Sequence, residues 1–320
     1  MKKLTILIAV IIQTIAVFSQ QLPEVSYYMY DYTRTNPGSI GSSDMVNVTG
    51  IFKNSLMNIP GQPTVSYFEA EMPFNFLGGK HGVGISFYND IIGFNNDIDL
   101  KLGYAFRFSA GDGTFGIGIN GGIKQHAFKD GAEWVSAGPI DPANDPRIPD
   151  LGSNNLNALS LGVGVFYRTE DIYFGASVLN VYAQDLDYSD VATTTTSAIE
   201  TLEPHYYATA GYTLQLNNPA FELQPSVNFY SDLSSVTFDV NGMLTYNKRL
   251  WGGVSYRASS SAVAMAGLMI MDGLKVGYAY DFQLTALNTY STGSHEIMLN
   301  YSFKLGVEKS PQRYKSIRYL

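Results

Sequence analysis

The sequence predicts an all-β protein, a transmembrane antiparallel β-barrel of about 14 strands. Three observations predict it: an apolar N-terminal leader, a composition with 15% charged and 13% aromatic residues, and long segments that alternate between apolar and polar residues. Alternation with a period of two indicates strands whose two faces meet different surroundings. A barrel wall needs few charges, because its outer face meets lipid and its rims are aromatic.

The leader has the features of a secretory signal peptide over residues 1–19. Lys2 and Lys3 give it a positively charged start, and an apolar stretch runs from Leu4 to Phe18. This stretch is shorter than the roughly 20 residues that a spanning helix needs, so a cleaved signal is favoured over a retained anchor. We expect cleavage between Ser19 and Gln20 and location of the mature chain in the outer membrane.

The alternation is clearest in residues 97–108. Side chains of a strand point alternately to opposite faces, so Ile98 and every second residue after it form one apolar face, while the set that begins with Asp97 is polar or small. Many such segments hold about 10 to 13 residues, the length of a tilted strand that crosses a bilayer. We expect strands near residues 46–57, 64–73, 82–90, 96–108, 114–128, 156–168, 171–181, 205–216, 220–231, 235–247, 249–258, 261–271, 273–284 and 294–305.

The connections between these segments alternate in length. With the first strand running outward, every even-numbered connection is short, and two of them contain the Asp-Gly pair of a tight hairpin. Both long connections, residues 129–155 and 182–204, fall in the odd-numbered set. Short periplasmic turns with longer outer loops are the pattern of an outer-membrane barrel. The alternative is a soluble β-sandwich or an extracellular adhesion domain, whose strands also alternate.

The sequence divides into four parts on this interpretation. After the leader there is no run of about 18 apolar residues, so spanning helices are excluded. Residues 20–45 are long enough to fill part of a lumen. The parts are the signal peptide of residues 1–19, an N-terminal segment of residues 20–45 in the lumen or the periplasm, a barrel of residues 46–305, and a basic periplasmic tail of residues 306–320.

The sequence predicts no enzyme, no cofactor and no metal site. The chain has no Cys, and its four His residues stand on different strands or rims without the spacing of metal ligands. The net charge of −8 excludes a general nucleic-acid binder, which needs a basic surface. Four glycines lie inside one alternating strand, where close packing or a kink explains them better than a phosphate loop: Gly116, Gly118, Gly121 and Gly122.

Two segments are candidates for contact with partner proteins. The loop of residues 141–150 carries three Asp and three Pro residues, which predicts a stiff surface loop, with calcium binding as the alternative. The tail combines basic and aromatic side chains, as a docking peptide for a periplasmic partner or as a disordered basic end. The candidate partner-binding residues are Asp141, Asp145, Arg147, Asp150, Arg313, Tyr314, Lys315 and Arg318.

Four segments, in order along the chain, resemble motifs of the PorP/SprF-type proteins of the type IX secretion system. Arg34–Gly41 resembles the N-P-A/G-x-x-G box near the mature N-terminus of that family, and Pro60–Thr64 resembles its G-x-P-T turn. Gly82–Gly93 resembles the next box, and Gly277–Leu299 is similar to the C-terminal signature. Their order and spacing extend over nearly the whole mature chain.

The resemblance implies a non-enzymatic outer-membrane barrel of Bacteroidota that acts in type IX secretion and gliding motility. As an anchor or assembly platform it would contact outer-membrane lipids, the periplasmic ring and lipoprotein components, and a large secreted or surface adhesin-like protein. One departure is that Lys53 and Leu56 stand where the family commonly has Arg-x-x-Trp. The alternative function is a transport channel for small or hydrophobic solutes such as fatty acids.

Overall fold

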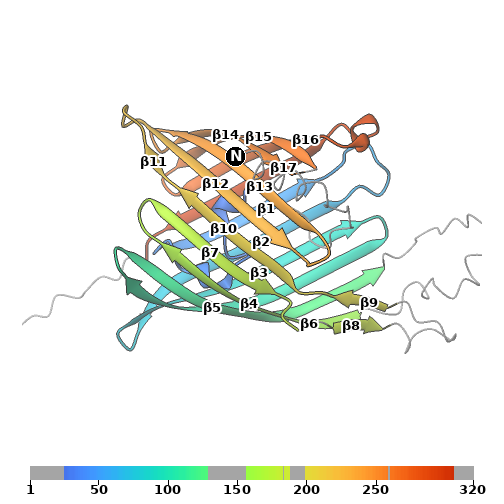
Figure 1. Ribbon diagram of the computed structural model, residues 1–320, viewed down its shortest axis with the longest axis horizontal. Coiled ribbons are helices and arrows are strands. Elements are labelled where there is room, and N and C mark those ends of the chain that lie inside the picture. The colour runs from blue at the N-terminus through green and yellow to red at the C-terminus, as the bar shows by residue number, and fades with distance from the viewer. Residues whose placement is uncertain (1–24, 129–155, 183, 188–198, 259, 306–320) are drawn as a thin grey trace, which may run out of the picture.

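The computed structural model describes residues 25–305 except 129–155, 183, 188–198 and 259. Within these residues, fourteen strands form one closed antiparallel barrel, which lies on its side in Figure 1. Neighbouring strands pair around the wall, and the last strand pairs with the first, with Phe303 opposite Val46. The predicted antiparallel barrel of about 14 strands is therefore confirmed.

The strand bounds lie within a few residues of the expected ones. The turn between the second and third strands is tighter than expected, because Leu77 and Gly78 alone connect the two strands through positive φ angles, as in a two-residue hairpin loop. The barrel strands are β1 (Val46–Asn54), β2 (Thr64–Phe76), β3 (Gly79–Ile92), β4 (Asn95–Ala110), β5 (Gly113–Phe128), β6 (Leu156–Arg168), β7 (Ile172–Leu179), β10 (His205–Tyr212), β12 (Phe221–Ser231), β13 (Val236–Tyr246), β14 (Leu250–Arg257), β15 (Ser261–Met271), β16 (Leu274–Gln283) and β17 (Ser294–Phe303).

Three short strands lie outside the regular wall. The strand expected over residues 205–216 ends at Tyr212, and β11 (Leu214–Gln215) pairs with β12 only. Within the expected long loop of residues 182–204, β8 (Gln184–Asp187) and β9 (Ile199–Leu202) form a ribbon of their own. Among the described residues, no helix is long and apolar enough to cross a membrane. The helical elements named below are 3-10 turns: η1 (Tyr28–Tyr30), η2 (Pro37–Ser39) and η4 (Ala286–Thr289).

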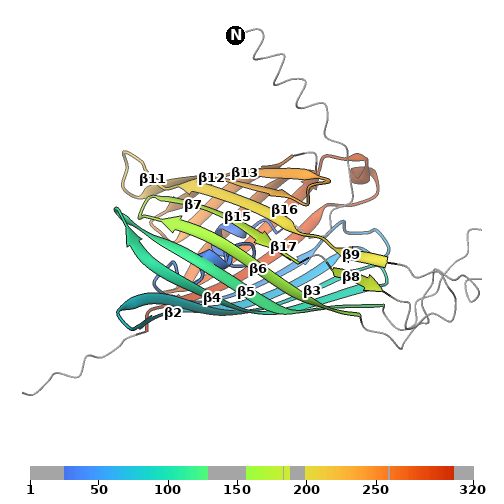
Figure 2. The ribbon, with the colours of Figure 1, turned by 60° about the horizontal axis from the view of Figure 1, so that its bottom comes forward.

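The two faces of each strand differ as the alternation predicts. In β4 the apolar set points outward, and Leu102 is 65% exposed, whereas Arg107 of the opposite set points inward and is 2% exposed. Figure 2 shows the strands slanting across the barrel, which is the tilt that closure requires. Exposed aromatic residues gather at both rims, where lipid headgroups meet the wall. They include Phe76, Phe106, Phe108, Phe174, Tyr212 and Tyr246 at one rim and Phe52, Phe94, Tyr256, Phe282 and Tyr290 at the other.

The two ends of the barrel are built differently. We call the end that carries the turns β2–β3, β4–β5, β6–β7, β13–β14 and β15–β16 the short-turn end. The opposite, long-loop end carries the ribbon of β8 and β9 and the loop with η4, all of which lie on the right in Figure 1. The loop of residues 129–155 belongs to this end, since it connects β5 and β6, but it lies outside the described residues.

Candidate functional site

The segment before β1 lies inside the barrel, as Figures 1 and 2 show for its blue ribbon. We call residues 25–45 the lumenal plug. Val25, Tyr27, Tyr28 and Ile40 of the plug are each at most 3% exposed. Val25 and Tyr27 belong to the main hydrophobic cluster of the molecule, together with inward-facing residues of the wall such as Met298. The apolar core of this protein is therefore formed between the plug and the barrel.

A carboxylate of the wall binds the beginning of the plug. The backbone N–H of Ser26 donates to both carboxylate oxygens of Glu296, at 2.8 and 3.0 Å, and the N–H of Tyr27 donates to one of them at 3.0 Å. The Ser26 hydroxyl donates to Asp281 at 3.0 Å. Hydrogen bonds to a charged acceptor are stronger than those between neutral groups. These contacts fix the entry of the plug against β16 and β17.

Glu296 is part of a buried group of five charges, which we call the latch cluster: Lys53, Asp239, Arg257, Asp281 and Glu296. The Lys53 ammonium lies 2.7 Å from Asp281 and 3.7 Å from Glu296. The Arg257 guanidinium lies 3.1 Å from Asp239 and 3.3 Å from Asp281. No side chain of the five is more than 7% exposed. Burial of charge is costly unless it is paired, and the three carboxylates of the cluster are bound by its two cations and by the plug N–H groups at Glu296.

Two tyrosines near the beginning of the plug also hold it to the wall. The Tyr27 hydroxyl lies 2.9 Å from the carbonyl of Ala266 and 2.8 Å from that of Tyr278, and the Tyr28 hydroxyl lies 2.9 Å from the Ser226 hydroxyl. Burial raises the pKa of Tyr28 and keeps its hydroxyl neutral. These side chains bind several strands at once.

The Arg34–Gly41 segment crosses the inner wall at a row of glycines. The Asn36 side chain accepts from the N–H of Gly38 at 2.9 Å and donates to the carbonyl of Val165 at 2.9 Å, which forms η2 and docks it. Four wall glycines, here called the glycine track, face this turn, because a Cβ on any of them would come within 2.2 Å of a plug oxygen. They are Gly82, Gly116, Gly118 and Gly164.

The contacts of the glycine track explain why glycines are needed in strand β5, where the sequence has Gly116, Gly118, Gly121 and Gly122. Gly116 and Gly118 allow the plug backbone to approach, and a Cβ on Gly122 would lie 1.9 Å from the carbonyl oxygen of Leu100 on the neighbouring strand. Close packing therefore explains three of these glycines. Within the described residues they lie in strand β5, without the helix that a phosphate loop requires.

The end of the plug is bound at the short-turn end. Arg107 of β4 lies 2.8 Å from Asp44, and Glu71 of β2 accepts from the N–H of Gly41 at 2.6 Å. The Ser177 hydroxyl donates to the carbonyl of Thr35 at 2.6 Å. Because these partners lie on different strands, only the closed barrel can hold the plug.

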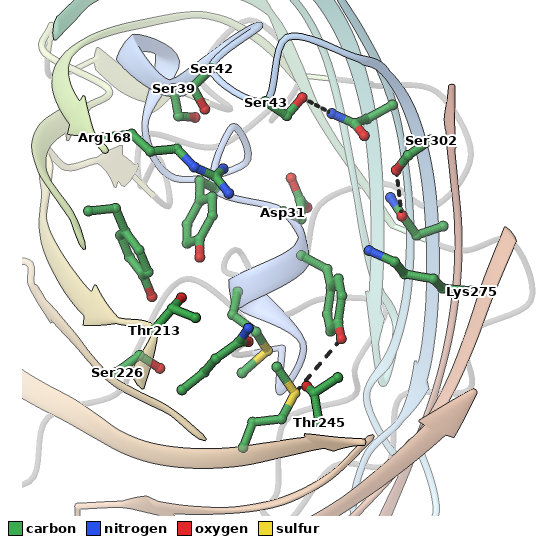
Figure 3. A pocket seen from close by; sticks show the side chains of 18 of the residues that line it. Asp31, Ser39, Ser42, Ser43, Arg168, Thr213, Ser226, Thr245, Lys275 and Ser302 are labelled. Atoms are coloured by element: carbon green, nitrogen blue, oxygen red, sulfur yellow. Dashed lines mark hydrogen bonds between the residues drawn. The ribbon is translucent and has the colours of Figure 1, made fainter. Parts of the chain in front are cut away.

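A cavity of about 420 Å³ lies between the plug and the short-turn end. We call it the vestibule; Met29–Thr33 of the plug and the inner wall line it. Figure 3 shows Arg168 and Lys275 extending from opposite walls, with Asp31 of the plug between them. The lining contains six acidic and three basic side chains: Asp31, Glu69, Glu71, Glu170, Asp171 and Glu222 against Arg168, Lys248 and Lys275.

The four histidines occupy rim or lumen positions, as expected. His81 and His295 face outward at opposite rims, where their Nδ1 atoms lie 2.7 Å from the Tyr104 hydroxyl and 2.6 Å from the Tyr278 hydroxyl. His126 pairs with Asp97 inside the barrel, and His205 is buried. Across the described part of the chain, no three His, Asp or Glu residues are grouped so as to hold a metal ion.

Comparison with models of known protein families shows the family to which this chain belongs. The family model described as type IX secretion system membrane protein PorP/SprF matches residues 17–301. The chain belongs to the PorP/SprF family. No curated protein matches this PorP/SprF chain.

Several solved structures are similar to this PorP/SprF chain at low sequence identity. The toluene transporter TbuX of Ralstonia pickettii is 11% identical, with a TM-score of 0.46, and the match covers 84% of this chain and 92% of TbuX. The NanC porin is 11% identical, with a TM-score of 0.35 and coverage of 81% and 100%. A triple mutant of the Rhodopseudomonas blastica porin is 9% identical, with a TM-score of 0.34 and coverage of 81% and 99%.

The family motifs lie where the PorP/SprF chain binds its own plug. The Arg34–Gly41 box is the part of the plug that docks on the glycine track, and the C-terminal signature contains Asp281 and Glu296 of the latch cluster. Lys53, which stands where the family commonly has Arg, supplies a cation to the same cluster. Lys53 therefore carries the same positive charge as the Arg that is common at this position in the family.

The predicted partner-binding residues of this PorP/SprF chain lie outside the described residues. They are Asp141, Asp145, Arg147 and Asp150 in the loop, and Arg313, Tyr314, Lys315 and Arg318 in the tail. Neither the latch cluster nor the vestibule was predicted from the sequence. The available signal was inward-facing charge, such as Asp239, Arg257 and Asp281 in otherwise alternating strands, because a lumen-facing charge in a barrel needs a partner.

Proposed function

We propose that this chain is a non-enzymatic anchor and assembly platform in the outer membrane, where it supports type IX secretion and gliding motility. The lumenal plug is the observation that carries this proposal. Its start is bound to Glu296 at the long-loop half of the barrel, and its end is bound to Arg107 at the short-turn end. A lumen occupied in this way leaves two faces for partners rather than a passage between them.

The two faces suit different partners. Short turns face the periplasm in outer-membrane barrels, so the vestibule opens toward the periplasmic ring and lipoprotein components. The long-loop end then faces outward, toward a large secreted or surface adhesin-like protein. We assign Asp141, Asp145, Arg147 and Asp150 to the outer contact and Arg313, Tyr314, Lys315 and Arg318 to the periplasmic one. Cleavage after Ser19 would precede insertion of the mature chain.

A solute channel, the alternative function, requires more than a plug. A channel that releases hydrophobic solutes into the membrane also needs a lateral opening in its wall. Within the described strands, every neighbouring pair around the wall is hydrogen-bonded, so no lateral opening is seen there. The register between paired strands is regular except at one shift between Met269 and Met271 of β15. This favours the platform over the channel.

The test is isolation of the affinity-tagged protein from outer membranes in mild detergent, with mass spectrometry of the proteins that accompany it. We expect periplasmic ring lipoproteins and one very large surface protein. The triple variant Asp141→Asn, Asp145→Asn and Asp150→Asn should lose the surface protein and keep the ring lipoproteins. Asp112→Asn, in a short turn, is the matched control and should keep both. A barrel recovered without partners would contradict the proposal.

A further inference from the structure

The vestibule has an excess of acidic side chains. Six carboxylates face three basic groups, a formal excess of three negative charges. Some groups of both signs are already engaged, since Lys248 pairs with Glu222 at 3.4 Å, the Lys275 ammonium lies 5.0 Å from the centre of the Tyr30 ring, and Glu71 accepts from the N–H of Gly41. Glu170 and Asp171 are exposed in the β6–β7 turn at the mouth. A ligand of this cavity should therefore carry positive charge.

The wall of the vestibule also offers an unpaired amide. Asn241 of β13 lines the cavity and is 3% exposed, yet neither its Nδ2 nor its Oδ1 has a hydrogen-bond partner within the described part of the chain. Buried polar groups without a partner are rare in native proteins. An amide side chain with a free donor and a free acceptor matches a peptide group, which offers one of each. This points to a peptide as the ligand.

A basic segment of the same chain begins at the mouth of the vestibule. Ser302 of β17 lines the cavity, and the tail of residues 306–320 starts four positions later. The tail carries Lys309, Arg313, Lys315 and Arg318 against the single acid Glu308. Its 15 residues span up to about 50 Å when extended, so the tail is long enough to turn back and enter. The formal charge of its side chains, +3, is opposite in sign to the acidic excess of the lining.

We propose that the chain's own basic tail binds in the vestibule through residues 313–319. Arg313, Lys315 and Arg318 face the carboxylates of the mouth, Tyr314 enters the cavity, and a tail peptide group bonds Asn241. The volume falls in the range of about 300–1,000 Å³ that ligand pockets have, so a short stretch enters and the remainder of the tail spans the rim. The same basic side chains become available to a periplasmic partner when the tail leaves. This inference does not rest on the secretion role, because it concerns the isolated protein.

Disulfide trapping tests the proposal. The chain has no Cys of its own, so every disulfide that forms must involve the introduced cysteines. Tyr314→Cys is combined with Thr245→Cys, whose side chain lines the vestibule (Figure 3). The matched control combines Tyr314→Cys with Asp272→Cys, in an exposed turn of the same end. The purified full chain in detergent is oxidised at low protein concentration. We expect the vestibule pair to form an intramolecular disulfide at least about fivefold faster than the control pair, as a docked segment has the higher effective concentration.

Charge reversal supplies the second arm of the experiment. Arg313→Glu, Lys315→Glu and Arg318→Glu together should lower the rate for the vestibule pair to that of the control pair, and high salt should act in the same direction. Equal rates of disulfide formation for the two pairs would overturn the proposal. A rate for the vestibule pair that charge reversal leaves unchanged would also overturn it. A third outcome is disulfide formation between molecules at a rate that rises with protein concentration. That outcome would show that the tail of a second copy enters the vestibule, and it would also overturn the proposal.

Limited trypsin digestion tests the docking without Cys substitutions. A docked tail is protected, so its basic sites should be cut slowly in the unmodified protein. The variant Glu170→Gln, Asp171→Asn and Glu222→Gln removes three carboxylates of the lining, each of which contributes a surface-type ion pair. We expect about fivefold faster cleavage after Arg313 in this variant. Unchanged cleavage in a variant whose barrel remains folded would contradict the proposal, and it would leave the secretion platform unaffected.

Discussion

Glu296 illustrates how single residues decide the state of the lumen. Its carboxylate binds the backbone of Ser26 and Tyr27 and, through Lys53, joins the other members of the latch cluster. A neutral side chain at this position would leave two buried cations with two carboxylates and the plug N–H groups without an anionic acceptor. Hydrogen bonds to a charged acceptor are stronger than those to a neutral one, so the main loss falls on the contact between wall and plug.

The variant Glu296→Gln should therefore destabilise the folded barrel by about 1–3 kcal/mol, because an amide oxygen is a weaker acceptor than a carboxylate for the N–H groups of Ser26 and Tyr27. Unfolding of the purified protein in urea, followed by its electrophoretic mobility without heating, measures the change. Glu222→Gln is the matched control. Its ion pair with Lys248 is 3.4 Å long, and the Lys248 side chain is 80% exposed, so the loss should stay below about 1 kcal/mol. Equal losses for the two variants would contradict the latch.

Gly118 tests the glycine track. The variant Gly118→Ala places a Cβ about 2.1 Å from the carbonyl oxygen of Pro37, so the plug backbone must shift. We expect a loss of about 1–3 kcal/mol, the usual cost of overpacking, and new trypsin cleavage after Arg34 in the displaced plug. Gly242→Ala is the control, because a Cβ there meets no atom within 4 Å. Protection of Arg34 in Gly118→Ala would show that the track does not seat the plug.

Among the elements of the fold, the plug occupies the lumen of a barrel of intermediate width. Eight-stranded barrels are filled by their own side chains, whereas barrels of 16 to 18 strands leave an aqueous channel. The fourteen strands observed here lie between these cases, and the plug lies in the lumen between the latch cluster and the vestibule. The state of the lumen therefore depends on one short segment.

Deletion of residues 25–43 should convert the barrel into an open pore. Conductance of the purified protein in planar bilayers measures this, with stable single-channel steps expected for the deletion variant and their absence for the full chain. Removal of residues 306–320 from an otherwise intact chain is the control and should remain closed, because the plug lies above the vestibule. Conductance of the unmodified protein equal to that of the deletion variant would contradict a closed lumen.

The strands could be predicted from the sequence, whereas the site could not. The period of two survives in the strands because one face meets lipid and the other the lumen, and Asp-Gly turns mark the hairpins near Asp112 and Asp272. The plug has no such period, and its anchor Glu296 lies 270 residues from Ser26. The latch cluster likewise combines charges from β1, β13, β14, β16 and β17, which closure of the barrel brings together. Alternation predicts the face on which a charge lies but not its partner on another strand.

The whole molecule is a membrane barrel of the PorP/SprF family whose lumen holds a plug and whose two ends differ. The short-turn end offers a vestibule lined by charged residues, and the long-loop end offers the ribbon of β8 and β9 and the longer connections. A protein that carried cargo through its lumen would have to release the plug. A platform would act with the plug in place.

A disulfide that locks the plug tests this distinction most directly. The pair Thr35→Cys and Ser177→Cys joins the plug to β7 at a contact of 2.6 Å between the Thr35 carbonyl and the Ser177 hydroxyl. Cells that carry only this variant are assayed for export of the large surface protein, with and without reductant, beside the two single-Cys variants. For a platform, we expect unchanged export in the locked state. Export that stops when the disulfide forms and returns on reduction would show that the lumen is a passage and would contradict the platform.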